Sequence, residues 1–387
     1  MGCGACCASG APQQRYKGSL RPNGKELDSG AAGAVHEASP KTGAVKKRQD
    51  WDTAPTANCD SVPQEEAFPV PLQSPSPLPV VGEDDRRVPG PLPVDRAKMR
   101  AVLREGPGAR RIEAWCSMAQ TLTAFQAGYP DFVRQRPTPE VHERIVRDLP
   151  RTYFADGPLD APGQRRLQNL LQAYAASDDA IGYCQGMNFL ASFLLEECGN
   201  EELAFGLLAA VMHEYNARGL FAQGTPLSQQ YLYVFRRLLQ CVLPDTYGVL
   251  EELSVPCELF ALKWFLSLFS LSLPRPVALR VWDLVFSDGL QMLLFVGAAV
   301  FKLMHPILAA AEDAETPVAV LNSLPVGCDK FLGSDFYAGA ETVVTEARAL
   351  AEQAAAGHVL DDLIQDWRNN CPRDRKLLDE LDTAAAA

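Results

Sequence analysis

From about residue 96 onward, apolar residues recur at helical spacing, and prolines divide the chain into segments of helix length. In one segment they stand three and four positions apart, as on the buried face of a helix: Leu167, Leu170, Leu171 and Tyr174. The same spacing continues over three turns from Tyr231 to Val242. Stretches that alternate with a period of two and end in hairpin turns are absent. The pattern therefore predicts an all-α body, folded as a single large multi-helical domain.

Several apolar runs predict where the centre of this body lies. Residues Leu203–Met212 and Leu259–Leu271 are apolar nearly all round, which is typical of central helices. Two runs approach the length of a membrane span, Cys257–Leu273 and Met292–Ala311, but charged residues interrupt both of them. We therefore interpret them as buried helices of a soluble protein.

Composition sets the expected domain boundaries. Residues 1–94 are rich in Gly, Ala, Ser and Pro, with ten prolines between Pro55 and Pro93. Such a segment lacks the apolar surface that would offset its chain entropy, so we predict a disordered arm, acting as a tether or as a ligand of a proline-binding domain. The helical domain is expected over 95–375, with Thr342–Asp382 forming one or two outer helices. Residues 376–387 are expected to be a frayed tail.

The first residues carry a pattern that permits lipid attachment. After removal of Met1, Gly2 is a candidate for myristoylation, although Cys6 stands where Ser or Thr is usual. Cys3, Cys6 and Cys7 are candidates for palmitoylation. A single myristoyl chain binds membranes only marginally, whereas a second acyl chain makes the anchor stable. The sequence leaves two alternatives open, an acylated arm at a membrane surface and an unmodified tail.

Charge and cysteine usage exclude several classes of protein. The chain has 36 basic and 48 acidic residues, a formal net charge of −12, which argues against nucleic-acid binding. Eleven cysteines are present, eight of them standing singly, and no secretory signal precedes them. We expect a cytoplasmic protein in a reducing compartment. No histidine stands at metal-ligand spacing, and no glycine-rich phosphate loop occurs, so we expect neither a metal nor a self-contained active site.

The first of two polar clusters lies where a helix is expected to stop. Asp148 and Arg151 are three residues apart, and Pro150 between them ends the helix. This spacing lets the Arg151 guanidinium project from the element end while Asp148 steadies it. An isolated pair of this kind is also a common structural salt bridge.

The second cluster is a loop flanked by glycines, which leads into the helix Phe189–Glu197. Gly182 and Gly186 allow the backbone to approach another group closely, and Gln185 carries an amide that both donates and accepts. Taken alone, Gln185 could equally be a helix cap or a solvated side chain.

Together and in this order, the two clusters resemble the TBC-domain family of GTPase-activating proteins for Rab GTPases. The family carries Ile-x-x-Asp-x-x-Arg followed some thirty residues later by Tyr-x-Gln, and here these positions are Ile145, Asp148, Arg151, Tyr183 and Gln185. The resemblance covers roughly residues 98–370. It continues through further segments: Gly186–Asn188, Trp264–Phe269, Leu279–Asp283 and Phe286–Gly289. In one departure, the family's Gly-Ile-Pro, followed by Arg and Trp, appears as Gly106-Pro107-Gly108, followed by Arg110, Arg111 and Trp115.

The resemblance implies catalytic residues that act in trans on a GTP-bound Rab GTPase. Arg151 would be an arginine finger and Gln185 a glutamine finger. Asp148 would orient Arg151, while Tyr183 and Asn188 would hold the Gln185 loop. GTP and Mg²⁺ would be carried by the partner, so no cofactor of the chain's own is expected. The expected place of action is the cytoplasm, at the cytosolic face of a membrane if the arm is acylated.

Other positions in the resemblance have a structural interpretation. We expect Ile145, Trp264 and Trp282 to be core residues and Asp283 to support a helix. Two alternative functions remain open at this point. One is a Rab-binding scaffold or effector in membrane trafficking with little catalytic effect. The other is an all-α hydrolase that uses a cysteine such as Cys184, although no histidine lies near it in the sequence.

Overall fold

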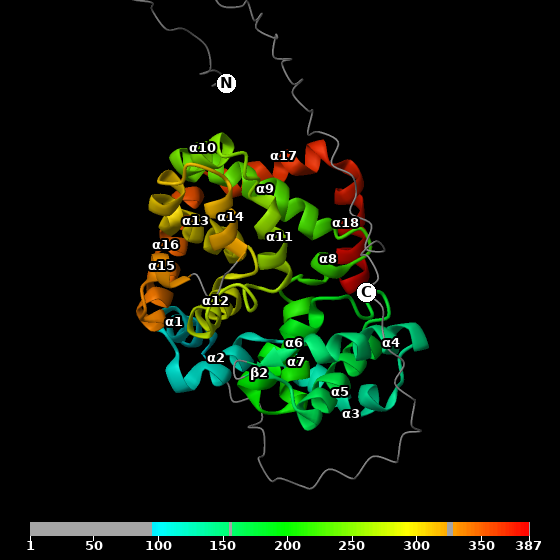
Figure 1. Ribbon diagram of the computed structural model, residues 1–387. Coiled ribbons are helices and arrows are strands. Elements are labelled where there is room, and N and C mark those ends of the chain that lie inside the picture. The colour runs from blue at the N-terminus through cyan, green and yellow to red at the C-terminus, as the bar shows by residue number, and fades with distance from the viewer. Residues whose placement is uncertain (1–94, 155–156, 323–327, 387) are drawn as a thin grey trace, which may run out of the picture. The chain divides into compact units, whose positions relative to one another are not determined.

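The computed structural model describes residues 95–154, 157–322 and 328–386. Within them the chain is almost entirely helical, which confirms the predicted all-α class (Figure 1). The one sheet among these residues is a short antiparallel pair, β1 (Tyr153–Phe154) and β2 (Gly157–Pro158). The predicted arm of residues 1–94 lies outside the described residues. So do the acylation candidates Gly2, Cys3, Cys6 and Cys7, and their modification stays a prediction from the sequence.

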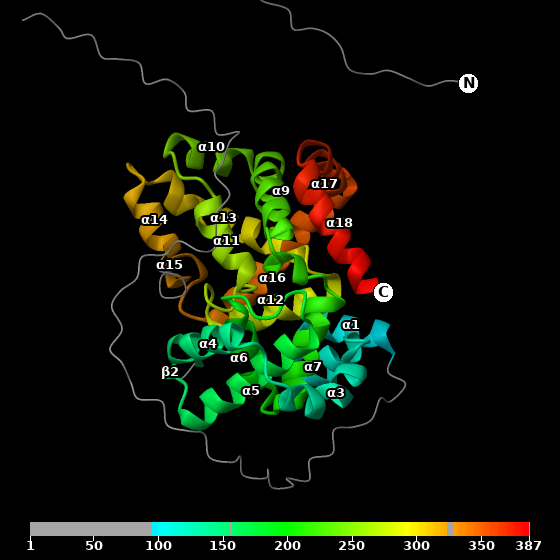
Figure 2. The same ribbon diagram turned by 90° about the vertical axis from the view of Figure 1, so that its right-hand side faces the viewer.

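The first group of helices lies together at the bottom of Figures 1 and 2. Its central members are α3, α5, α6 and α7, with α5 packed against each of the other three. The elements of this part are α1 (Arg96–Glu105), η1 (Gly108–Arg110), α2 (Arg111–Met118), α3 (Leu122–Arg134), α4 (Pro139–Asp148), η2 (Leu149–Arg151), α5 (Ala161–Ser177), α6 (Met187–Cys198) and α7 (Glu201–His213).

The second group lies above it in both views. In this group α16 packs against α12 and α13, and α9 packs against α17 and α18. Helix α12 also contacts α1 and α2, so it joins the two groups. The elements are α8 (Arg218–Phe221), α9 (Pro226–Val242), α10 (Pro244–Glu252), α11 (Glu258–Leu266), α12 (Arg275–Asp288), α13 (Met292–Ala309), α14 (Glu315–Asn322), α15 (Asp329–Leu332), α16 (Phe336–Ala356), α17 (Val359–Asn370) and α18 (Pro372–Ala386).

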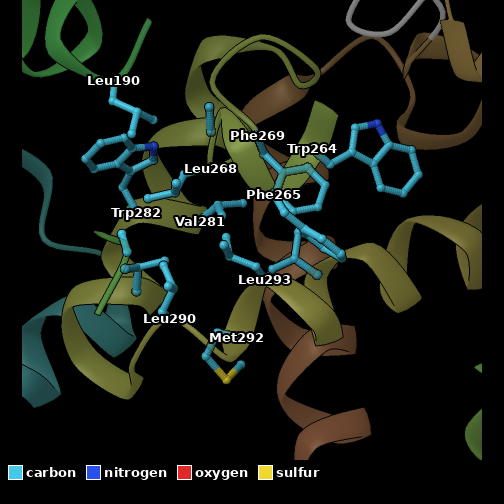
Figure 3. Packing of buried hydrophobic residues seen from close by; sticks show 14 of the residues in the cluster. Leu190, Trp264, Phe265, Leu268, Phe269, Val281, Trp282, Leu290, Met292 and Leu293 are labelled. Carbon is cyan, nitrogen blue, oxygen red and sulfur yellow. The ribbon is translucent and has the colours of Figure 1, made fainter. Parts of the chain in front are cut away.

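Large aromatic side chains fill the core between these helices, as Figure 3 shows for residues of α11, α12 and the start of α13. Trp264 and Trp282 are buried, and the ring of Trp282 stacks on Phe193 with centroids 4.9 Å apart. Ile145 is also fully buried. The predicted core roles of Ile145 and the two tryptophans are therefore confirmed.

Asp283 is a buried carboxylate that connects α12 to the start of the helical part. It accepts hydrogen bonds from Arg111 Nε at 3.0 Å, from Trp115 Nε1 at 2.9 Å and from Arg280 Nη1 at 3.0 Å. Arg280 in turn donates to Glu341 of α16 at 2.7 Å. The predicted helix-supporting role of Asp283 is confirmed. Two of its three donors, Arg111 and Trp115, follow the segment Gly106–Gly108, where the sequence departs from the family's pattern.

The predicted helix Leu259–Leu271 is shorter and less buried than expected. Helix α11 ends at Leu266, because Leu268 and Phe269 adopt positive φ angles of 45° and 62° in the following turn. Leu259 is 64% exposed and Leu262 is 37% exposed. An all-round apolar run thus gives a helix with only one buried face, so the prediction of a central helix here is wrong in part.

The C-terminal segment also differs from its prediction. Three helices follow residue 335, one more than predicted, and the first of them, α16, packs one face on α12 and α13 while its other face is exposed. The segment predicted as a frayed tail, 376–387, belongs to α18 as far as Ala386. Leu378 of α18 is only 8% exposed, because this helix packs against α8 and α9.

Helix α13 is the one described helix long and apolar enough to cross a membrane, and 67% of its 18-residue window is buried within the protein. It packs against α10, α12 and α16. This position supports the interpretation of Met292–Ala311 as a core helix.

Candidate functional site

Arg151 projects from the end of α4, where the sequence predicts a helix stop. Asp148 is the last residue of α4, and the chain continues as the single turn η2 through Pro150. Asp148 is 4% exposed, whereas the Arg151 side chain is 48% exposed. Arg151 Nη2 donates to Asp148 Oδ1. The guanidinium is therefore open to a partner while a buried carboxylate fixes its orientation.

Tyr183 connects this arginine to the loop between α5 and α6. Its hydroxyl donates to Asp148 Oδ2 at 2.6 Å, and the side chain is 1% exposed. Burial, together with the hydrogen bond to Asp148, raises the pKa of Tyr183, so the hydroxyl stays protonated and remains a donor. The two oxygens of Asp148 thus hold Arg151 on one side and the loop on the other.

Asn188 and Thr152 complete a buried polar network around Asp148. Asn188 Nδ2 donates to Thr152 Oγ1 at 2.7 Å, and Thr152 Oγ1 donates to the Asp148 carbonyl at 2.7 Å. Both side chains are fully buried. The Asn188 side-chain oxygen also accepts the Gly186 N–H at 3.1 Å, which ties the end of the loop to α6. Thr152 is absent from the sequence prediction, since a threonine beside an arginine carries no signal of its own.

Gln185 stands exposed on this loop, between the anchored Tyr183 and Gly186. Gly186 has a φ of 108°, and a Cβ there would lie 3.6 Å from the Phe221 ring. A glycine is therefore favoured at this turn by its backbone conformation. The structure brings all five predicted site residues to one place: Asp148, Arg151, Tyr183, Gln185 and Asn188. The exposed Arg151 and Gln185 share one buried support, an arrangement suited to acting on a bound partner.

The family model for the Rab-GTPase-TBC domain matches residues 114–308, which include all of this network. The chain belongs to the Rab-GTPase-TBC domain family. It is similar to Growth hormone-regulated TBC protein 1 of Homo sapiens, with 31% identity over 62% of this chain and 71% of that protein. It is also similar to GTPase-activating protein GYP5 of Saccharomyces cerevisiae, with 37% identity over 40% of this chain and 17% of that protein.

Solved structures of TBC domains share the fold. The TBC domain of the Chlamydomonas flagellar RabGAP superposes with a TM-score of 0.55 at 24% sequence identity, covering 66% of this chain and 85% of that one. The chain spans only 17–22% of the length of the first three curated relatives it matches, so these relatives are much longer proteins.

No group of three or more potential metal ligands lies together in the part of this TBC protein that the structure describes.

The contribution of the Tyr183–Asp148 hydrogen bond can be measured as a change in the free energy of unfolding. Replacing Tyr183 with phenylalanine leaves one oxygen of the buried Asp148 without its strongest donor, so we expect the free energy of unfolding to fall by about 1–3 kcal/mol. Urea denaturation measures the change. Tyr247→Phe is the matched control, since that hydroxyl makes an exposed hydrogen bond to Glu251, and its removal should cost less than about 0.5 kcal/mol. Equal losses in the two variants would show that the hydrogen bond to Asp148 stabilises the fold no more than the exposed one to Glu251.

Proposed function

We propose that this protein accelerates GTP hydrolysis by a Rab-family GTPase and supplies Arg151 and Gln185 in trans. The observation that carries the proposal is the exposure of these two side chains on one buried network built on Asp148. Membership of the Rab-GTPase-TBC domain family supports it, as does the similarity to a protein named as a GTPase-activating protein, GYP5.

Arg151 would act on the charge that develops during phosphoryl transfer. The transition state spreads negative charge over the phosphoryl oxygens, and a planar guanidinium can bridge two of them. Known arginine fingers accelerate hydrolysis by about 10³–10⁵, which corresponds to roughly 4–7 kcal/mol of barrier. Asp148 would lower the entropic cost of this contact, because it already holds the guanidinium from one side.

Gln185 would position the attacking water. Its amide oxygen can accept a hydrogen bond from the water while its N–H₂ group donates to a phosphoryl oxygen, so one side chain can fix the line of attack. The glutamine would take this task over from the GTPase. GTP and Mg²⁺ would arrive with the partner, so the binding-competent partner is the GTP-loaded form.

Replacing Gln185 with alanine tests this assignment. We expect single-turnover GTP hydrolysis in the complex to slow by about 10²-fold, because the water loses its orientation, while affinity for the GTP-loaded partner changes little. Stopped-flow phosphate release measures the rate. Gln365→Ala removes an exposed glutamine of α17 and should leave the rate unchanged. A normal rate with Gln185→Ala would mean that the GTPase orients the water itself.

A further inference from the structure

A buried ion pair lies at the base of the loop that carries Gln185. Asp178 and Arg218 are each 6% exposed. Arg218 donates from Nε and from Nη2 to the two carboxylate oxygens of Asp178, both at 2.8 Å. This two-point contact fixes the relative orientation of both groups as well as their distance.

Asp178 directs the chain from α5 into the loop. It is the C-cap of α5, and its carboxylate accepts a further hydrogen bond from the Tyr174 hydroxyl at 2.9 Å. Its carbonyl accepts the N–H groups of Ile181 at 3.2 Å and Gly182 at 2.7 Å. One residue therefore sets the direction of the chain that reaches Tyr183 and Gln185.

Arg218 belongs to a helix that meets the loop at both ends. It is the first residue of α8, and Phe221, the last residue of α8, lies against Gly186 at the far end of the loop. Helix α8 is itself held on α9 by the Ser228 hydroxyl, which donates to the Leu220 carbonyl at 3.2 Å. The loop thus has one fixed point on α4, through Tyr183 and Asp148, and two on α8.

We infer that Asp178 and Arg218 are positioning residues for Gln185, which hold its loop in register with Arg151. The inference rests on the proposed function, because it assigns the pair to the glutamine finger. A buried ion pair adds little to stability compared with apolar residues of the same size, and its better attested use is to fix one geometry. Two further titratable groups face Asp178, the Tyr174 hydroxyl and His213, whose Nε2 lies 3.6 Å from Asp178 Oδ2. Burial lowers the pKa of His213.

Arg218→Lys tests the inference, because it keeps the charge and removes the fork. With the full chain and a GTP-loaded Rab that it accelerates, we expect kcat to fall about tenfold and KM to stay unchanged. In a Gln185→Ala background the same substitution should cause no further fall, since the finger it positions is already gone. A fall of equal size in both backgrounds would overturn the inference.

Amide hydrogen exchange gives a readout that does not depend on the GTPase. We expect faster exchange in residues 179–186 of Arg218→Lys, and also of Asp178→Asn should the lysine variant fail to fold. Arg166→Lys is the matched control, because Arg166 joins α5 to Glu201 and Gly199 near the start of α7, at the opposite end of α5 from the loop. Equal exchange in this loop for wild type, variant and control would overturn the inference. Faster exchange without acceleration of any Rab would uphold the loop assignment and refute the proposed function.

Discussion

Replacement of Arg151 by alanine is expected to reduce the acceleration of GTP hydrolysis by at least about a hundredfold, and the loss can reach the 10³–10⁵ seen for arginine fingers. The reason is that no other group on the Asp148 network carries a positive charge that could reach a partner. The free energy of unfolding should fall by no more than about 1–3 kcal/mol, because the buried Asp148 loses one donor but keeps its hydrogen bond from Tyr183. Single-turnover hydrolysis and urea denaturation of the same preparation separate the two effects.

Two variants control this experiment. Arg147→Ala removes the same charge from an exposed position on α4, so near-normal acceleration is expected. Arg151→Lys keeps the charge but loses the planar fork, and it should recover little of the rate. Acceleration retained in full by Arg151→Ala would remove this residue from the mechanism.

Asp283→Ala is expected to have the largest effect on stability, a loss of about 3–5 kcal/mol in the free energy of unfolding. Asp283 is fully buried, and its removal leaves the Arg280 guanidinium, whose side chain is 5% exposed, without one of its two carboxylate partners. The Trp115 indole N–H and the Arg111 guanidinium lose their acceptor as well. Because these residues lie on α2 and α12, the loss should loosen the contact between the two groups of helices.

Urea denaturation of Asp283→Ala measures this prediction as a shift of the unfolding midpoint. Asp379→Ala is a suitable control, because its ion pair with Arg375 is long at 3.9 Å and half exposed, and such pairs contribute about 0–1 kcal/mol. A shift no larger than that of the control would mean that the hydrogen bonds and ion pairs of Asp283 do not stabilise the fold as expected.

Local periodicity was sufficient to predict the helices that have one buried face. Leu167, Leu170, Leu171 and Tyr174 are all buried in α5, since their spacing alone decides which side faces inward. Where nearly every position is apolar it succeeded for Leu203–Met212, since residues 204–212 of α7 are all buried, but failed in part for Leu259–Leu271, because hydrophobicity alone does not show which faces other helices cover. In α11, Leu259 and Leu262 lie on the face that no other described helix covers, and they are exposed. The segment 376–387 was predicted as a tail because α18 has few apolar residues. One of them, Leu378, packs against α8 and α9, which are far away in the sequence, so local periodicity could not show its burial.

The candidate site was predictable only as far as its motif extends. Asp148, Arg151, Tyr183, Gln185 and Asn188 form one cluster, as the resemblance implies, and their roles in catalysis stay a proposal. The residues around them carry no sequence signal. Thr152 is one example, and the Asp178–Arg218 pair is another, because its two members stand 40 positions apart and follow no period.

The most direct test of the proposed function is GTP hydrolysis by a panel of purified Rab GTPases, measured with and without the full chain. The proposed function predicts strong acceleration for one or a few members and none for the rest, and the accelerated members identify the partner. Binding of GTP-loaded Rab without acceleration of any member would contradict it, and would make this TBC protein a scaffold that holds its partner without catalysis.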